Sequence, residues 1–211
     1  TDKAYVDVTD DLRYLKNGKQ FIITSERDGF RHIYLFDMKG KLVKQLTKGA
    51  WEVSEFVGVD EAKGLAYYVS AEASPMQRHL YRVDLKGKGK TRLGEAGGGT
   101  DVVNMSPDFR YYLNYHSAAN EPTTVSLRTA QDGKLVKVLE DNAALKQKMK
   151  DFGFTPQEFF SFKTSEGVTL SGCTIKPANM EAGKKYPVLT FMYGGPGSQK
   201  VLDKWNSVDY Y

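Results

Sequence analysis

The chain has 211 residues, of which 40% are hydrophobic and 27% are charged, and these proportions are ordinary for a globular protein. Its 30 basic and 26 acidic residues are interspersed and give a net charge of only +4, which argues against a nucleic-acid-binding protein. No apolar run approaches the roughly 20 residues that a membrane-spanning helix needs. The 13 tyrosines and 11 phenylalanines favour β-structure over a helical bundle.

Three similar units fill the first 140 or so residues, and each unit contains several short runs of strand-forming residues. The runs are 18–24, 31–37 and 41–46, then 64–70, 78–84 and 90–93, then 108–114, 124–128 and 134–139. Tyr34, Tyr81 and Ser126 hold matching places, 47 and 45 residues apart. Such a period, with several short strands in each unit, is typical of β-propeller blades, which bury their faces only against neighbours. The sequence therefore predicts three consecutive blades, an incomplete circle.

The histidines of this region are predicted to be structural. His32 and His79 hold the same place in successive units, and a catalytic base does not need a copy one blade away. His116 lies near the end of a predicted strand, and none of the three belongs to a paired metal-ligand motif, so no metal or cofactor is expected. Gly97-Gly98-Gly99 lacks the Lys-Ser or Lys-Thr that follows a phosphate-binding loop, so a flexible connection between blades is expected there.

The pattern changes near residue 140. Asp141 and Asn142 precede a run that predicts a capped short helix, which would end near Gly153 and Pro156. Residues 159–164, 167–177 and 188–192 are predicted to be three strands. The last is apolar and rich in strand formers, as in a strand buried on both faces of a parallel sheet. An α/β-hydrolase domain begins in this way, so a domain boundary is predicted near residue 155.

A glycine-rich turn, Tyr193-Gly194-Gly195-Pro196-Gly197, follows the third of these strands. In α/β-hydrolases the loop after the third strand helps to build the oxyanion hole, and glycines permit positive φ and close backbone approach there. The phenol of Tyr193 could donate a hydrogen bond to the oxyanion of a tetrahedral intermediate; the alternative is a tyrosine that caps a strand end. No Gly-x-Ser-x-Gly nucleophile motif occurs in the chain. The sequence thus predicts an oxyanion stabiliser without its nucleophile.

Four segments, in this order and spacing, resemble the dipeptidyl peptidase IV branch of the prolyl oligopeptidase family. They are Ser-Glu-Arg-Asp-Gly-Phe-Arg-His-Ile-Tyr at 25–34, Leu-Thr-Lys-Gly-Ala-Trp-Glu-Val at 46–53, Val-Leu-Glu-Asp-Asn-Ala-Ala-Leu at 138–145, and Lys-Tyr-Pro-Val-Leu-Thr-Phe-Met-Tyr-Gly-Gly-Pro-Gly-Ser-Gln at 185–199. The resemblance spans about residues 14–211. It implies an eight-bladed propeller over an α/β-hydrolase domain, with the active site between them.

The resemblance also divides the chain. Residues 1–154 would be the C-terminal blades of the propeller, and residues 155–211 would be the start of the catalytic domain, truncated before the nucleophile. Members of this family are serine peptidases that remove dipeptides from free peptide N-termini, with proline or alanine as the second residue. Tyr193 matches the family tyrosine that helps to stabilise the oxyanion. The family's serine, aspartate and histidine and its amine-binding glutamate pair have no counterpart here, so the chain alone is expected to be an inactive fragment.

Two other functions stay open, a non-catalytic propeller that binds proteins, and an endopeptidase or acylaminoacyl peptidase of the same superfamily. The expected partners are peptides with a free N-terminus. The parent protein is expected to be a homodimer, and the fragment is expected to associate by domain swapping or by pairing of strand edges. The single cysteine, Cys173, excludes an internal disulfide and is expected to be a buried thiol. The resemblance implies a bacterial periplasm or cell surface.

Overall fold

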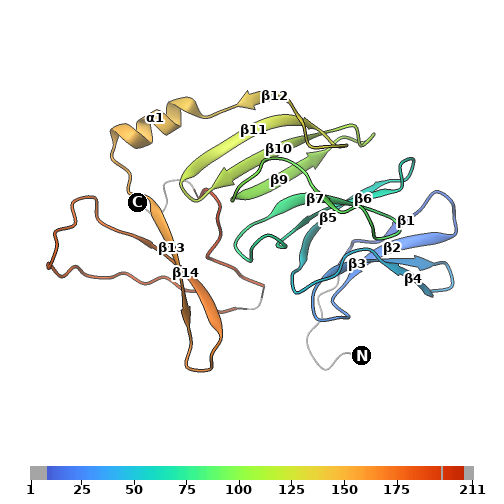
Figure 1. Cartoon of the computed structure of the whole chain (residues 1–211), viewed down its shortest axis with the longest axis horizontal. Coiled ribbons are helices and arrows are strands. Elements are labelled where there is room, and N and C mark those ends of the chain that lie inside the picture. Colours follow the sequence, from blue (N-terminus) through green and yellow to red (C-terminus); the bar gives the residue numbers. More distant parts are fainter. Residues whose placement is uncertain (1–8, 196, 207–211) are drawn as a thin grey trace.

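Four antiparallel sheets make up the computed structural model, which describes residues 9–195 and 197–206 (Figure 1). Three of these sheets have four strands each, hydrogen-bonded in chain order, and the fourth is a two-stranded hairpin. We call the three larger sheets blades 1, 2 and 3. Their strands are β1 (Arg13–Tyr14), β2 (Gln20–Ser25), β3 (His32–Asp37) and β4 (Leu42–Gln45); β5 (Val53–Asp60), β6 (Leu65–Ser70), β7 (His79–Asp84) and β8 (Thr91–Arg92); and β9 (Thr100–Met105), β10 (Tyr111–Ala118), β11 (Glu121–Thr129) and β12 (Leu135–Glu140).

This topology confirms the three repeats predicted from the sequence. Tyr34, Tyr81 and Ser126 each lie on the third strand of their blade, so the predicted alignment of the units is correct. Each blade is a meander of sequence neighbours, which is the arrangement of propeller blades.

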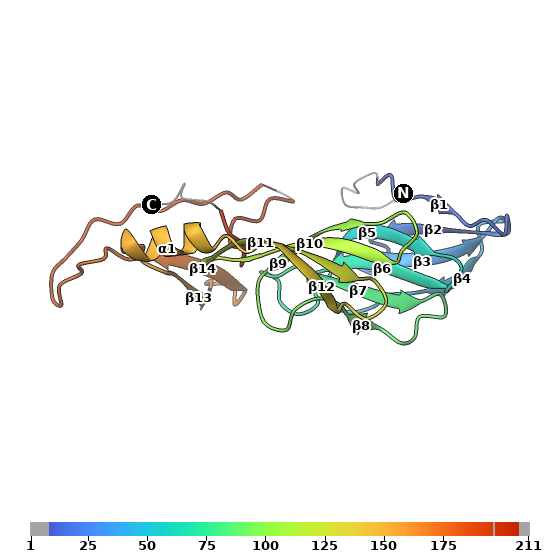
Figure 2. The ribbon, with the colours of Figure 1, turned by 90° about the horizontal axis from the view of Figure 1, so that it is seen from above.

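The blades stack face to face through two hydrophobic cores (Figure 2). Ile22 and Ile33 of blade 1 pack in one core with Tyr68 of blade 2, whereas Tyr67 packs in the other core with Tyr112 of blade 3. Tyr67 and Tyr68 are consecutive on β6, and successive side chains of a strand point to opposite faces. Blade 2 is therefore covered on both faces, as expected for units that bury their surfaces only against neighbours.

The hydroxyl of Tyr68 is buried and has no hydrogen-bond partner within the described residues. The ring of Tyr68 stacks on the ring of Tyr81, with 5.7 Å between the ring centroids. We expect Tyr68→Phe to leave the free energy of unfolding within about 1 kcal/mol of wild type or to raise it, because an unsatisfied buried polar group is removed. Tyr34→Phe is the matched control, because the Tyr34 hydroxyl accepts a hydrogen bond from Gln45 Nε2 at 3.2 Å. Urea unfolding measures both, and a Tyr68→Phe variant less stable than Tyr34→Phe would contradict the expectation.

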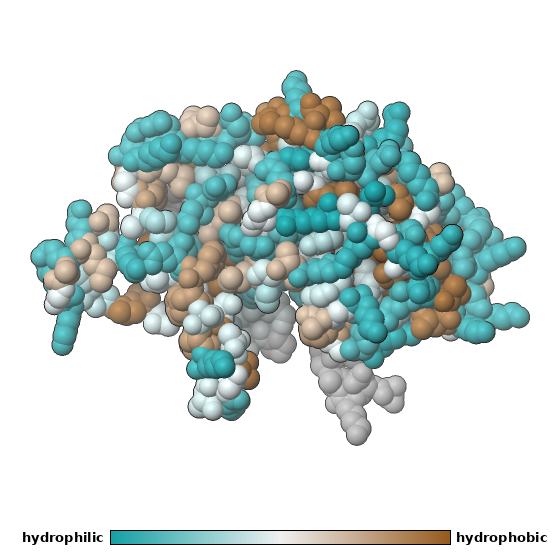
Figure 3. Space-filling view, viewed as in Figure 1, coloured by the Kyte–Doolittle hydropathy of each residue, from teal (hydrophilic) through white to brown (hydrophobic). Residues whose placement is uncertain are grey.

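The last strand of blade 3, β12, is an exposed edge. Its side chains Leu135, Val136, Val138 and Leu139 are each about half exposed and form an apolar patch at the top of Figure 3. Exposed strand edges can pair with other chains. Edge-paired association of the chain therefore stays a prediction.

Helix α1 (Ala143–Asp151) confirms the short helix predicted after blade 3, but its cap differs in detail. Asp141 Oδ1 accepts a hydrogen bond from Ala143 N at 2.9 Å, whereas Asn142 adopts a left-handed conformation with φ 52° and does not cap with its side chain. Gly153 has φ 66° just beyond the last turn, where a glycine C-cap is common. No helix within the described ranges is long and apolar enough to cross a membrane.

Strands β13 (Gln157–Lys163) and β14 (Thr169–Ile175) form the hairpin and confirm two of the three strands predicted after the helix. The third prediction, a buried strand at 188–192, is wrong. Those residues have no regular structure, and the side chains of Val188 and Leu189 are 86% and 97% exposed. An interior strand needs partner strands for its backbone groups, and no described residue supplies them. Cys173 on β14 is half-buried rather than buried.

Candidate active-site loop and its surroundings

Tyr193 and the glycines after it lie on the surface, in the irregular segment that follows the exposed residues 188–192. The Tyr193 side chain is 60% exposed, and the ammonium of Lys200 lies 5.4 Å from the centre of its ring. A Cβ atom at Gly195 would lie 2.6 Å from the ring atom Cε1 of Tyr193, so only glycine allows the ring to fold over the backbone there. The phenol of Tyr193 thus lies on the surface, close over the backbone of Gly195.

The far end of this loop is fixed to blade 2. Gln199, six residues after Tyr193, donates a hydrogen bond from Nε2 to Pro75 O at 2.8 Å. Its Oε1 accepts a hydrogen bond from Arg78 Nη2 at 2.9 Å. Pro75 and Arg78 belong to the connection between β6 and β7, so the loop that carries the predicted site residue contacts the end of a blade.

A buried carboxylate, Asp101 at the start of β9, joins blades 2 and 3. It accepts hydrogen bonds from His116 Nδ1 at 2.8 Å, His79 Nδ1 at 3.1 Å and Asn114 Nδ2 at 3.0 Å. Burial alone would raise the pKa of Asp101, but these three hydrogen bonds outweigh burial and hold the pKa below its usual value. His79 lies on β7 of blade 2 and the other three residues on blade 3, so this cluster ties the two blades together.

The histidines are structural in this arrangement, as predicted, but they are not equivalent. His32 is fully buried, and its ring nitrogens hydrogen-bond Thr47 Oγ1 and Gly49 O, each at 3.0 Å. His79, at the matching place of blade 2, contacts the Asp101 carboxylate instead. The sequence did not reveal that His79 and His116 share one acceptor, because they lie on different blades and no local pattern links them.

The hydrogen bond that His116 donates to Asp101 raises the pKa of His116, burial lowers it, and the nearby charges of Asp101, Glu95 and Glu121 raise it further. A pKa raised in the folded state stabilises the protein below the unfolded pKa of about 6.5, and this stabilisation is lost as the pH rises through the folded pKa. We therefore expect His116→Gln to lower the free energy of unfolding more at about pH 5.5 than at about pH 9. Urea unfolding at the two pH values measures this, and equal losses at both would contradict it.

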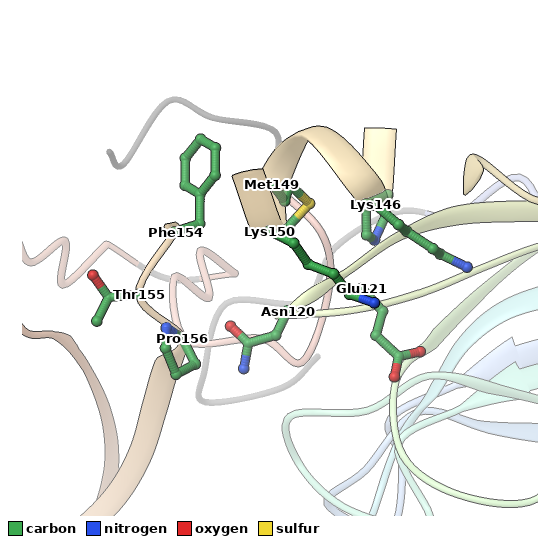
Figure 4. A pocket seen from close by; sticks show the side chains of 9 residues that line it. Asn120, Glu121, Lys146, Met149, Lys150, Phe154, Thr155 and Pro156 are labelled. Atoms are coloured by element: carbon green, nitrogen blue, oxygen red, sulfur yellow. The ribbon is translucent and has the colours of Figure 1, made fainter. Parts of the chain in front are cut away.

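A hollow of about 400 Å³ lies where α1 and the following linker meet the turn between β10 and β11 (Figure 4). Asn120 fastens this turn to β13, since its Oδ1 accepts from Gln157 N at 2.7 Å and its Nδ2 donates to Gln157 O at 3.0 Å. None of the predicted site residues lines the hollow. Its lining consists of Asn120, Glu121, Pro122, Lys146, Met149, Lys150, Phe154, Thr155 and Pro156.

Metal binding finds no support in the part of the chain that the structure describes. No group of three or more His, Cys, Asp or Glu side chains is arranged there to hold a metal ion.

Comparisons with known proteins agree with this fold. The family described as the dipeptidyl peptidase IV N-terminal region matches residues 1–123. Dipeptidyl peptidase 4 of Trichophyton rubrum is 35% identical over 196 residues, which cover 92% of this chain and 25% of that protein. A probable dipeptidyl peptidase 4 of Aspergillus flavus is 30% identical over 191 residues, covering 90% of this chain and 25% of that protein.

A solved structure extends the likeness to three dimensions. The crystal structure of Porphyromonas gingivalis dipeptidyl peptidase 4 superimposes with a TM-score of 0.86 at 40% sequence identity, covering 93% of this chain and 28% of that chain. The chain spans about a quarter of the length of the curated relatives it matches. With its blades, its sequence and its structural match in agreement, the chain belongs to the dipeptidyl peptidase IV family.

Proposed function

We propose that the chain is part of a serine exopeptidase that releases N-terminal X-Pro or X-Ala dipeptides from peptides. The observation that carries the proposal is the likeness over more than nine-tenths of the chain to proteins named dipeptidyl peptidase 4, in sequence and in structure. The loop at Tyr193, fixed to the end of blade 2 through Gln199, adds a chemical group suited to such a reaction.

In this proposal the blades and the segment after them belong to different domains. Residues 1–154 are propeller blades, and residues 155–211 begin an α/β-hydrolase domain whose further strands lie in the longer protein. Strand partners there would cover the apolar residues 188–192, which are exposed in this chain. The nucleophilic serine, the histidine that takes its proton and the aspartate that orients the histidine would also lie in the longer protein.

Tyr193 would stabilise negative charge in the reaction. When the serine attacks the scissile carbonyl, the carbonyl oxygen becomes an oxyanion, and a preformed hydrogen bond from the phenol would lower the energy of that state more than that of the substrate. Because this chain lacks a nucleophile motif, we expect no peptidase turnover from the 211 residues alone. Turnover by the purified chain would contradict that expectation.

The full-length protein tests the proposal with a Gly-Pro chromogenic substrate and with the same substrate acetylated at its N-terminus. We expect cleavage of the free-amine form only, because a dipeptidyl peptidase must bind the charged amine. Cleavage of both forms would indicate an endopeptidase or acylaminoacyl peptidase. Cleavage of neither would favour a non-catalytic binding protein. A periplasmic or cell-surface location belongs to the same proposal, and cell fractionation tests it.

A further inference from the structure

The segment Gln199–Trp205 lies against the ends of blades 2 and 3, where Figure 1 shows the dark red trace passing the left-hand ends of these sheets. Its contacts come from three connections: the one between β6 and β7, the one before β9, and the turn after β10. Residues more than 80 positions apart in the sequence meet here. The contact is therefore a tertiary docking and not a local turn.

Asp203 is the centre of this docking. Its Oδ2 accepts hydrogen bonds from Gly99 N at 2.7 Å and from Gln77 Nε2 at 3.1 Å, and its Oδ1 accepts one from Ala119 N at 3.0 Å. Its own backbone N donates to Met76 O at 2.9 Å. Hydrogen bonds from backbone N–H groups to a carboxylate are shorter and stronger than those between neutral groups. One side chain thus binds both blades.

The glycines before β9 make room for this carboxylate. A Cβ atom at Gly98 would lie 2.7 Å from Asp203 Oδ2 and 2.7 Å from Gln77 Nε2. Gly99 has φ +96°, and a Cβ atom there would lie 2.5 Å from Ser117 O. The glycines lie in the connection between blades 2 and 3, as the sequence predicted, and the close backbone approach at Gly98 and Gly99 gives a second reason for glycine there.

The docked segment is also the end of the Tyr193 loop. Gln199 and Asp203 follow Tyr193 by six and ten residues, and both contact the connection between β6 and β7. A loop fixed at its far end to a rigid sheet samples fewer positions than a free one, and catalytic groups lose much of their effect when displaced by about 1 Å.

We propose that Asp203 is a positioning residue for Tyr193. By holding Gln199–Trp205 against blades 2 and 3, Asp203 fixes the loop that presents the phenol to the reacting carbonyl and joins that loop to the propeller. The expected effect of Asp203 on catalysis rests on the proposed function, whereas the docking of residues 199–205 is tested separately by hydrogen exchange.

The experiment uses the full-length protein with the variants Asp203→Asn and Gly98→Ala. In Asp203→Asn the side chain keeps one acceptor oxygen, but its NH₂ group replaces the other oxygen and faces an N–H donor. In Gly98→Ala the carboxylate of Asp203 is unchanged, but the added Cβ atom displaces it. Glu166→Gln, in the exposed turn between β13 and β14, is the matched carboxylate-to-amide control. Two quantities are measured: hydrogen exchange of peptides that cover residues 199–206, and the kinetics of Gly-Pro substrate cleavage.

We expect Asp203→Asn and Gly98→Ala to raise exchange in this segment about tenfold while exchange in blade 1 stays unchanged. We also expect kcat to fall about tenfold or more, with KM within about twofold, because the amine-binding groups are untouched. Combining Asp203→Asn with Tyr193→Phe should lower kcat no further than Tyr193→Phe alone, which a merely structural role would not produce.

Each other outcome overturns a definite part of the inference. Unchanged exchange in the segment would show that Asp203 does not hold it. Raised exchange with unchanged kcat would show that the docking exists but does not position Tyr193, and the proposed function would stand. A wild-type protein without Gly-Pro cleavage would overturn the proposed function and the positioning role together, and the exchange data would still report on the docking.

Discussion

Tyr193→Phe in the full-length protein is expected to lower kcat for a Gly-Pro substrate on the order of a hundredfold or more. Loss of one preorganised oxyanion donor typically costs about 2.7–4 kcal/mol in the chemical step. The phenol would act only once charge develops on the carbonyl oxygen, so KM should change little. Steady-state kinetics on the purified variant measures both constants.

Tyr186→Phe is the control for this variant. Tyr186 lies seven residues earlier in the same irregular segment, and its hydroxyl accepts a hydrogen bond from Glu181 N at 3.0 Å. Its removal takes away a phenolic hydroxyl outside the proposed site and should leave kcat near wild type. A Tyr193→Phe enzyme with wild-type turnover would show that Tyr193 is not the oxyanion donor.

Asp101→Ala is expected to lower the free energy of unfolding of the chain by about 3–5 kcal/mol, as is typical when one partner of a buried charged network is removed. The side chain of Asp101 is only 2% exposed, and the variant leaves the donors of His79, His116 and Asn114 without their shared acceptor. Unpaired buried donors keep their full desolvation penalty. Two blades lose their connection at once, so the effect should be among the largest of any polar substitution.

The pH dependence of this variant gives a second check. Because the folded-state pKa of Asp101 is lowered, its stabilisation is present above the unfolded pKa of about 3.9 and is lost as the pH falls through the folded pKa. The difference between wild type and Asp101→Ala should therefore stay large near neutral pH and shrink only in acid. Glu166→Gln, an exposed control, should change stability by no more than about 0.5 kcal/mol. A loss for Asp101→Ala as small as that of the control would contradict the network.

The blades were predictable from the sequence because their signals are local. Strand-forming runs and turn residues recur at a fixed spacing, and Tyr34, Tyr81 and Ser126 mark the same strand in each blade. The signals that predict helix α1 are equally local, since Asp141 and Gly153 mark its two ends. Secondary structure that depends on near neighbours can be read from such patterns.

The strand that was wrongly predicted and the contact that was missed both depend on partners distant in the sequence. Residues 188–192 have the composition of a buried strand, but a strand forms only where another strand offers its backbone groups. Asp203 accepts a hydrogen bond from Gly99, 104 residues away, and nothing near either residue in the sequence indicates the contact. The glycine run 97–99 was the available signal, because three consecutive glycines between strands indicate close backbone approach as well as flexibility.

The most direct test of the proposed function identifies the products formed from an unlabelled peptide. This peptide carries proline as its second residue and a further proline in its interior. Mass spectrometry of the full-length protein's reaction should show a dipeptide and a peptide shortened by its first two residues, with the internal proline bond intact. Cleavage after the internal proline, or an unchanged peptide, would contradict the proposal that this chain is part of an enzyme that releases N-terminal dipeptides.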